Sequence, residues 1–158
     1  MKHFFIVILL FLLDQITKTF VVNSYQLNSS QEVSSYLNVV FIYNSGFLFG
    51  YFSDLSPTLL FYTHFILFFI SIYIIYWFLF VYLSTRTISL LFFAGALGNS
   101  YDRLFRKGVV DFLDFHYLNS HWPAFNLADS FILIGVIIYF VKYFRGEEIV
   151  YRNSWRSW

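Results

Sequence analysis

Long apolar runs dominate the chain, and few polar positions interrupt them. A membrane-spanning helix needs roughly 20 mainly apolar residues. Four runs reach or approach that length, at about 4–22, 58–83, 87–104 and 128–144. The pattern therefore predicts an α-helical polytopic membrane protein with four transmembrane helices, forming one membrane-embedded domain over residues 1–158.

The segment between the first two runs, about 23–57, has a different pattern. Its stretch SSYLNVVFIYNSG alternates weakly, is rich in β-branched and aromatic residues, and ends at the turn signal Asn44-Ser45-Gly46. We therefore expect a small β-containing lobe at the outer, periplasmic surface, where Tyr suits the membrane interface. A second outer segment, a loop, is expected at about 105–127.

Composition supports the membrane interpretation and excludes several classes of function. The chain is 59% apolar, whereas soluble domains lie near 45–50%. A net charge of +1 is too small to neutralise many phosphates, so we expect no nucleic-acid partner. The chain has no cysteine, which excludes disulfides, thiolate metal sites and cysteine nucleophiles.

The distribution of Lys and Arg predicts the orientation, because short cytoplasmic loops are enriched in them. The segment 23–57 contains neither residue, whereas Lys2, Arg86, Lys142 and Arg145 share one side of a four-helix arrangement. Both termini are therefore expected in the cytoplasm. Arg106 and Lys107 would lie on the outer side, where we expect them at the lipid headgroups.

Polar residues within the spans need an explanation, because a charge in a membrane is costly. Asp14 and Lys18 are spaced i,i+4 and could form a structural ion pair or contact substrate. Asn99 and Arg103 have the same spacing, with Asp102 between them, at the outer end of the third helix. A packed helix end with an Asp102–Arg103 pair is the structural interpretation of that group.

Two further acids are predicted to meet at the outer membrane boundary. Asp111 lies in VVDF, which is typical of a short buried strand, and Asp129 lies near the start of the last helix. Asn126 could cap that helix, and an acid in its first turn is favoured by the helix dipole. A structural role is open for Asp129 alone. The presence of two acids together with Asn99, Arg103 and Asn126 at one surface favours a catalytic role.

Two carboxyls that share a site keep one proton between them. The ionised one can activate water while the protonated one polarises a carbonyl, which is peptide hydrolysis without a metal or a covalent intermediate. The four histidines show no HExxH spacing, and we expect no metal and no cofactor. His116 and His121 are expected to bracket a loop that turns at Pro123, and Asp114 is a secondary candidate.

Four motifs occur in order over nearly the whole chain. They are Asp14-Gln15-Ile16-Thr17-Lys18, then Asn44-Ser45-Gly46 with Phe49-Gly50, then GALGNSYDR followed by GVVDF, and finally WPAFNLADSFILIG. In this set and order the chain resembles the bacterial lipoprotein signal peptidases, the type II signal peptidases.

The resemblance implies an aspartic endopeptidase of the inner membrane that removes signal peptides from diacylglyceryl-modified prolipoproteins, cleaving before the lipid-modified cysteine. It implies Asp111 and Asp129 as the catalytic pair at the periplasmic face. Membrane lipid and the prolipoproteins are the expected partners, and a monomer is expected. The supporting residues implied by the motifs are Asn44, Gly46, Asn99, Arg103 and Asn126 at the site, with Asp14, Lys18 and Asp102 holding the architecture or contacting the lipid-bearing substrate.

Some positions depart from the family pattern. Phe47 and Leu48 replace small residues, and Ala94 stands where a second glycine is common, which bears on substrate fit. Two alternatives stay open: a non-enzymatic four-helix transporter or assembly subunit whose acids bind protons or cations, and an inactive relative that binds lipidated peptides. The first predicts that Asp14 and Asp102 matter as much as the two proposed catalytic acids.

Overall fold

The computed structural model describes residues 2–44, 58–59, 62, 65–66, 69–70, 73 and 86–146. The named elements within them are α1 (Lys2–Ser24), β1 (Ser30–Ser34), β2 (Leu37–Asn44), α3 (Arg86–Phe105), β3 (Val109–Tyr117), β4 (Ser120–His121) and α4 (Leu127–Phe144). The first, third and fourth predicted helices are thereby confirmed to within two residues at each end. The predicted second helix, 58–83, lies largely outside the described residues, so the count of four stays a prediction.

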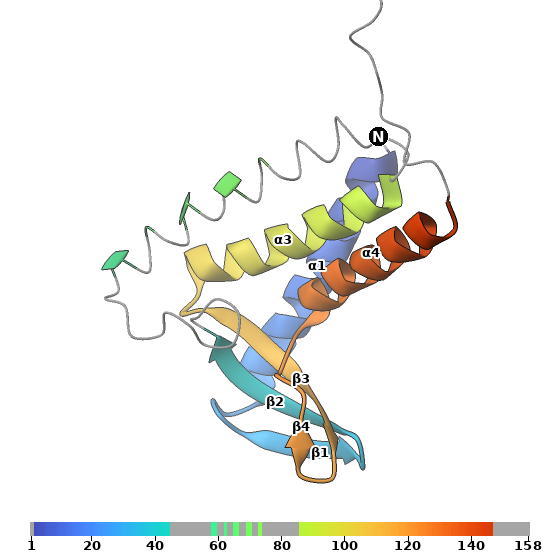
Figure 1. The fold of residues 1–158 in the computed structure, drawn as a ribbon. Coiled ribbons are helices and arrows are strands. Elements are labelled where there is room, and N and C mark those ends of the chain that lie inside the picture. Colours follow the sequence, from blue (N-terminus) through green and yellow to red (C-terminus); the bar gives the residue numbers. More distant parts are fainter. Residues whose placement is uncertain are drawn as a thin grey trace, which may run out of the picture.

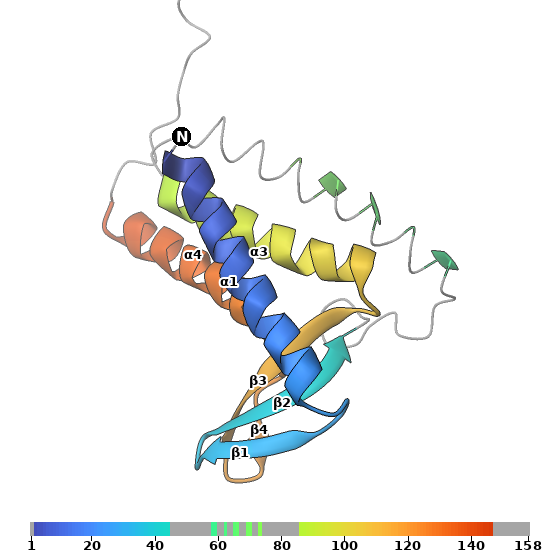
Figure 2. The same ribbon diagram turned by 180° about the vertical axis from the view of Figure 1, so that it is seen from behind.

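The three described helices pack together, with α3 against both α1 and α4. The sheet projects from one end of this group (Figures 1 and 2). The start of α1, the start of α3 and the end of α4 lie together at the opposite end (Figure 1). Consequently the end of α1, the end of α3 and the start of α4 all point toward the sheet, and their terminal residues can meet there.

Glycines allow α3 to approach its neighbours closely. A Cβ on Gly95 would collide with the backbone oxygen of Ala128 and with Ile132 of α4. A Cβ on Gly98 would collide with the Asp14 carboxylate of α1 and lie 3.3 Å from the Ala128 Cβ. These two positions have no room for a larger residue, in agreement with the role of small residues between membrane helices.

The outer surface of the helices is apolar. Among the described helices, α1 from Phe4 onward and α4 are long and apolar enough to cross a membrane. Large side chains on both are exposed, including Phe20 on α1 and Phe144 on α4. Exposed apolar area on this scale marks contact with lipid or a partner in preference to water.

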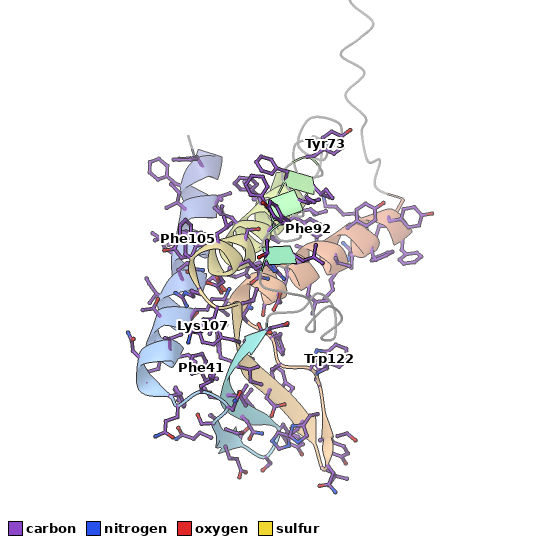
Figure 3. The ribbon with its side chains drawn as sticks, turned by 90° about the vertical axis from the view of Figure 1, so that its left-hand side faces the viewer. Phe41, Tyr73, Phe92, Phe105, Lys107 and Trp122 are labelled. Atoms are coloured by element: carbon purple, nitrogen blue, oxygen red, sulfur yellow. The ribbon has the colours of Figure 1, made fainter. Side chains whose placement is uncertain are left out.

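The strands form an antiparallel sheet in the order β1-β2-β3-β4. Its core contains Phe41, Val110 and Phe112 together with Val21 from the last turns of α1, and Figure 3 shows Phe41 beside that helix. The predicted β-containing lobe is thus present over 30–44. In the expected outer loop the short buried strand predicted at VVDF is confirmed, but it extends over 109–117, and 120–121 form a further strand.

The predicted turn at Pro123 is wrong. His116 and His121 are paired across the hairpin of β3 and β4, with their rings stacked at 5.2 Å. The chain reverses between Tyr117 and Ser120, which are also paired, and Leu118 adopts a positive φ of 53° there. The chain therefore turns before His121, and Pro123 lies in the segment that leads to α4.

Candidate active site

Asp111 lies on β3 where that strand passes the ends of the helices. The pairing of β2 with β3 shifts between Val39 and Ile42, and Asp111 is paired with Ile42 directly after the shift. Such a bulge bends the strand and changes the direction of its side chains. The Asp111 side chain is buried, and its two oxygens accept hydrogen bonds from Asn44 Nδ2 at 3.0 Å and Asn126 Nδ2 at 2.7 Å.

Asp129 lies in the first turn of α4 and is half-buried. Asn126 caps this helix, as the sequence predicts: its Oδ1 accepts from the Asp129 backbone N–H at 3.0 Å. The Asp129 carboxylate in turn accepts from the Asn126 backbone N–H at 3.2 Å, which completes a capping box. The other Asp129 oxygen accepts from Asn99 Nδ2 at 2.7 Å.

Asn126 therefore connects the two acids, since it is fully buried and bonded to both. Burial raises the pKa of Asp111 to about 7, and the neighbouring Asp129 carboxylate adds to this effect, while the bonds from Asn44 and Asn126 oppose it. We call Asp111 and Asp129 the aspartate pair. The two acids predicted from the sequence to share a site are in fact brought together.

Arg103 approaches the pair from α3. Its Nη1 donates to the backbone oxygen of Asn99 at 3.4 Å, and its charge faces both Asp129 and Asp111. A cation beside two carboxylates favours their ionised forms. Of the residues predicted to surround the acids, Asn44, Asn99, Arg103 and Asn126 are all placed there.

A buried ion-pair network lies behind the aspartate pair. Lys18 Nζ is 2.8 Å from Asp14 Oδ2 and 2.9 Å from Asp102 Oδ2, and all three side chains are fully buried. The same Nζ donates to Asn99 Oδ1 at 3.0 Å. The i,i+4 pair of Asp14 and Lys18 is thus confirmed, and Asp102 joins it from another helix.

Arg106 belongs to this network, so its predicted place at the lipid headgroups is wrong. Its Nε is 3.4 Å from Asp102 Oδ1, and its Nη2 donates to Thr19 Oγ1 at 2.9 Å and to Gln15 Oε1 at 3.3 Å. The i,i+4 spacing of Asp102 and Arg106 is a signal that could have identified this pair. Lys107 is exposed where the helices meet the sheet (Figure 3).

Asp114 forms a separate cluster on the sheet. Its carboxylate accepts from Asn38 Nδ2 at 2.9 Å and lies 3.0 Å from His121 Nδ1. Burial works to raise the pKa of Asp114, but the bonds from Asn38 and His121 and the charges of His121 and His116 outweigh it and lower that pKa below its usual 3.8. Asp114 thus connects β2, β3 and β4. Sequence reasoning did not identify Asn38, since its partner is 76 residues away.

Comparisons with known proteins identify the family of the chain. A family model described as signal peptidase (SPase) II matches residues 6–145. The chain belongs to the signal peptidase II family. Two relatives are lipoprotein signal peptidases, from Aeromonas hydrophila (36% identical, covering 94% of this chain and 91% of the relative) and from Thermodesulfovibrio yellowstonii (37% identical, covering 86% and 90%). The resemblance seen in the motifs is thereby confirmed.

Solved structures support the same fold for this signal peptidase II family member. Two structures described as a bacterial membrane enzyme each match with a TM-score of 0.74. The first is 30% identical to the chain and covers 93% of it, and the second is 31% identical and covers 90%. In both cases the match extends over 92% of the solved structure. A membrane enzyme with a small β region is therefore the established fold class.

Some expectations for the site cannot be compared with the structure. Gly46, Phe47 and Leu48 lie outside the described residues, so their predicted effects on the site and on substrate fit stay predictions. Within 2–44 and 86–146 no group of three His, Asp or Glu side chains is placed to hold a metal ion. A metal-free reaction likewise stays a prediction.

Proposed function

We propose that the chain is an aspartic endopeptidase that removes signal peptides from prolipoproteins in the bacterial inner membrane. Membership of the signal peptidase II family makes it a protease of lipoprotein processing. The observation that carries the aspartic mechanism is the aspartate pair, joined through the buried Asn126. No feature of the comparisons supports the alternative of a transporter or assembly subunit.

The proposed chemistry uses one proton shared by the pair. With the pKa of Asp111 near 7, this carboxyl is still protonated in about half of the molecules at neutral pH and supplies the proton of the pair. The ionised carboxylate takes a proton from water, whose oxygen attacks the scissile carbonyl carbon, while the protonated carboxyl donates to the carbonyl oxygen. The tetrahedral species then collapses, the C–N bond breaks, and the departing nitrogen receives a proton. The products are a signal peptide with a new carboxylate and a protein with a free amino terminus.

The neighbouring residues have distinct proposed roles. Asn44 and Asn126 hold Asp111 between two amide donors, and Asn99 donates to Asp129. Arg103 supplies positive charge where negative charge develops in the transition state. The three hydrogen bonds leave the acids little freedom to rotate, which preorganises them for attack on a peptide carbonyl.

The position of the pair suits a substrate that remains in the bilayer. Both acids lie where the apolar helices meet the sheet: Asp111 is on β3, and Asp129 is in the first turn of α4 (Figure 1). A diacylglyceryl-modified cysteine would place its acyl chains in the membrane and the preceding peptide bond at this junction. Cleavage before that cysteine follows as part of the proposal.

Charge and topology support a periplasmic active site with cytoplasmic termini. Lys142 and Arg145 lie at the end of α4 away from the sheet, next to the start of α1 (Figures 1 and 2). The segment 23–57, whose described part 23–44 lies on the sheet side, has no Lys or Arg. Short loops rich in Lys and Arg remain in the cytoplasm. The sheet and the aspartate pair are then outside, and we propose that the enzyme acts as a monomer.

A cleavage assay tests this function. Purified protein in detergent is incubated with a diacylglyceryl-prolipoprotein, and the products are identified by mass spectrometry. Wild type should release a signal peptide that ends immediately before the cysteine, whereas Asp111→Asn and Asp129→Asn, which keep size but remove the charge, should be inactive. A folded variant of either acid that cleaves at the wild-type rate would refute the assignment.

A further inference from the structure

We infer that Lys18 is a positioning residue that orients both catalytic carboxyls from behind, through Asn99 and through the backbone beside each acid. The inference rests on the proposed function, since it assigns a role relative to the aspartate pair. It replaces the two roles left open for Lys18, a structural ion pair or a contact with substrate, by one specific role in the reaction.

The first route runs through Asn99. An ammonium group has three N–H donors, and Lys18 directs them at Asp14, Asp102 and Asn99 Oδ1. Because the cation holds the amide oxygen of Asn99, the amide nitrogen must point the other way, to Asp129 Oδ1 at 2.7 Å. Lys18 therefore determines that Asn99 presents a donor, and not an acceptor, to the catalytic carboxylate.

The second route runs through the backbone. Asp14 uses its Oδ1 to accept from the Ala128 N–H at 2.9 Å, and Ala128 directly precedes Asp129. Asp102 uses its Oδ2 to accept from the Val110 N–H at 3.2 Å, and Val110 directly precedes Asp111. Each carboxylate paired with Lys18 thus holds the residue before one catalytic acid. The single cation between them keeps the two attachment points together.

Burial excludes a direct contact between Lys18 and substrate. Lys18, Asp14 and Asp102 have no exposed surface. Replacing Lys18 alone would leave two buried carboxylates near each other, with only Arg106 opposite Asp102, and an uncompensated buried charge destabilises a protein strongly. A test therefore needs a second variant in which the charge of the network is balanced.

Lys18 also affects the ionisation of the pair. The charged groups facing Asp111 are Asp129 from α4, Lys18 from α1 and Arg103 from α3. Lys18 works against the burial that raises the pKa of Asp111. Without this cation the pKa of Asp111 rises. The alkaline limb of the profile of kcat against pH, where protonated Asp111 is lost, then moves to higher pH.

The experiment compares Lys18→Met and the charge-balanced Lys18→Met/Asp14→Asn with wild type in the prolipoprotein cleavage assay. In the double variant the substituted amide keeps an oxygen for the Ala128 N–H, and Asp102 keeps Arg106. Thr17→Val is the matched control, because among the described residues the Thr17 hydroxyl bonds to the Leu13 and Asp14 carbonyls of its own helix and to neither acid of the aspartate pair. Folding is checked by circular dichroism and gel filtration, and kcat and KM are measured from pH 5 to about 9.

The expected result for the double variant is a kcat at least roughly tenfold lower and a KM within about twofold of wild type, with a pH profile close to that of wild type, because one positive and one negative charge are removed together. Lys18→Met alone removes only the cation, so it should in addition move the alkaline limb of the profile to higher pH. Thr17→Val should match wild type. A raised KM with an unchanged kcat in the double variant would show a substrate contact and overturn the inference, as would wild-type kinetics. Asp111→Asn and Asp129→Asn are measured in the same assay. If both are inactive, either of these outcomes for Lys18 refutes only the role of Lys18 and leaves the proposed function intact.

Discussion

Replacing Asn126 separates its two tasks, capping α4 and holding Asp111. Asn126→Ala removes the cap on the Asp129 N–H and the donor to Asp111. Asn126→Ser keeps a capping oxygen, because Ser and Asn cap helices about equally well, but cannot supply the amide donor. The pair of variants thus differs mainly in the cap, while both lose the bond between Asn126 and Asp111.

The size of each effect follows from the contacts. Loss of the cap costs about 1 kcal/mol, and loss of a bond to a carboxylate that is partly ionised costs about 1.5–3 kcal/mol. Asn126→Ala should therefore lower the free energy of unfolding by about 2–4 kcal/mol, and Asn126→Ser by about 1 kcal/mol less. Because the amide donor opposes the burial that raises the pKa of Asp111, its loss raises that pKa above about 7.

The assays are thermal unfolding in detergent, followed by tryptophan fluorescence, and prolipoprotein cleavage as a function of pH. Both variants should lose at least roughly tenfold in kcat/KM at pH 7, and the alkaline limb of the profile, where protonated Asp111 is lost, should move to higher pH. An Asn126→Ser enzyme with wild-type activity and an unchanged profile would refute the reasoning, since Asn126 would then act as a cap only.

Three further predictions concern packing, the sheet and metal dependence. Gly98→Ala should destabilise the protein by about 1–3 kcal/mol in thermal unfolding, because its Cβ would collide with the Asp14 carboxylate. Gly135→Ala on α4 is the control and should be neutral or stabilising, since the nearest atoms to its Cβ are 3.5 Å away. Equal effects of the two substitutions would contradict the packing. Asp114→Asn should lower the free energy of unfolding by about 1 kcal/mol at pH 6. Because the pKa of Asp114 is lowered on folding, this contribution is present above pH 3.8 and is lost as the pH falls through the folded pKa. A difference in stability between the variant and wild type that persists at pH 2 would contradict this prediction. EDTA should leave cleavage unchanged, and inhibition that Zn²⁺ reverses would indicate a metal site.

The sequence predicted the helices well because the determining signals are local. Apolar runs of sufficient length set α1, α3 and α4, and the spacing of Asn126 and Asp129 set the start of α4. The hairpin of β3 and β4 was missed because a turn of Leu118 and Asn119 lacks the usual glycine, and Leu118 adopts a positive φ without it.

The site was predictable where its residues share an element or a family motif. Asp14 and Lys18 are one helical turn apart, and the aspartate pair was inferred from two segments that reach the same membrane boundary. Contacts between different elements have no regular spacing in the sequence that would reveal them. Lys18 and Asn99, for example, are 81 residues apart. Arg106 was misplaced because its position was inferred from the membrane boundary alone, whereas Asp102, one helical turn earlier, forms an ion pair with it.

The central claim is that Asp111 and Asp129 share one proton near neutral pH, and an infrared titration tests it most directly. The carboxyl stretch of protonated Asp111 is isolated as the difference between wild type and Asp111→Asn, and is followed from pH 4 to about 9. The band should persist at pH 6 and disappear with a midpoint near 7, as burial beside Asp129 requires. A midpoint near the ordinary value of 3.8 would show that Asp111 is fully ionised at neutral pH and would contradict the shared proton.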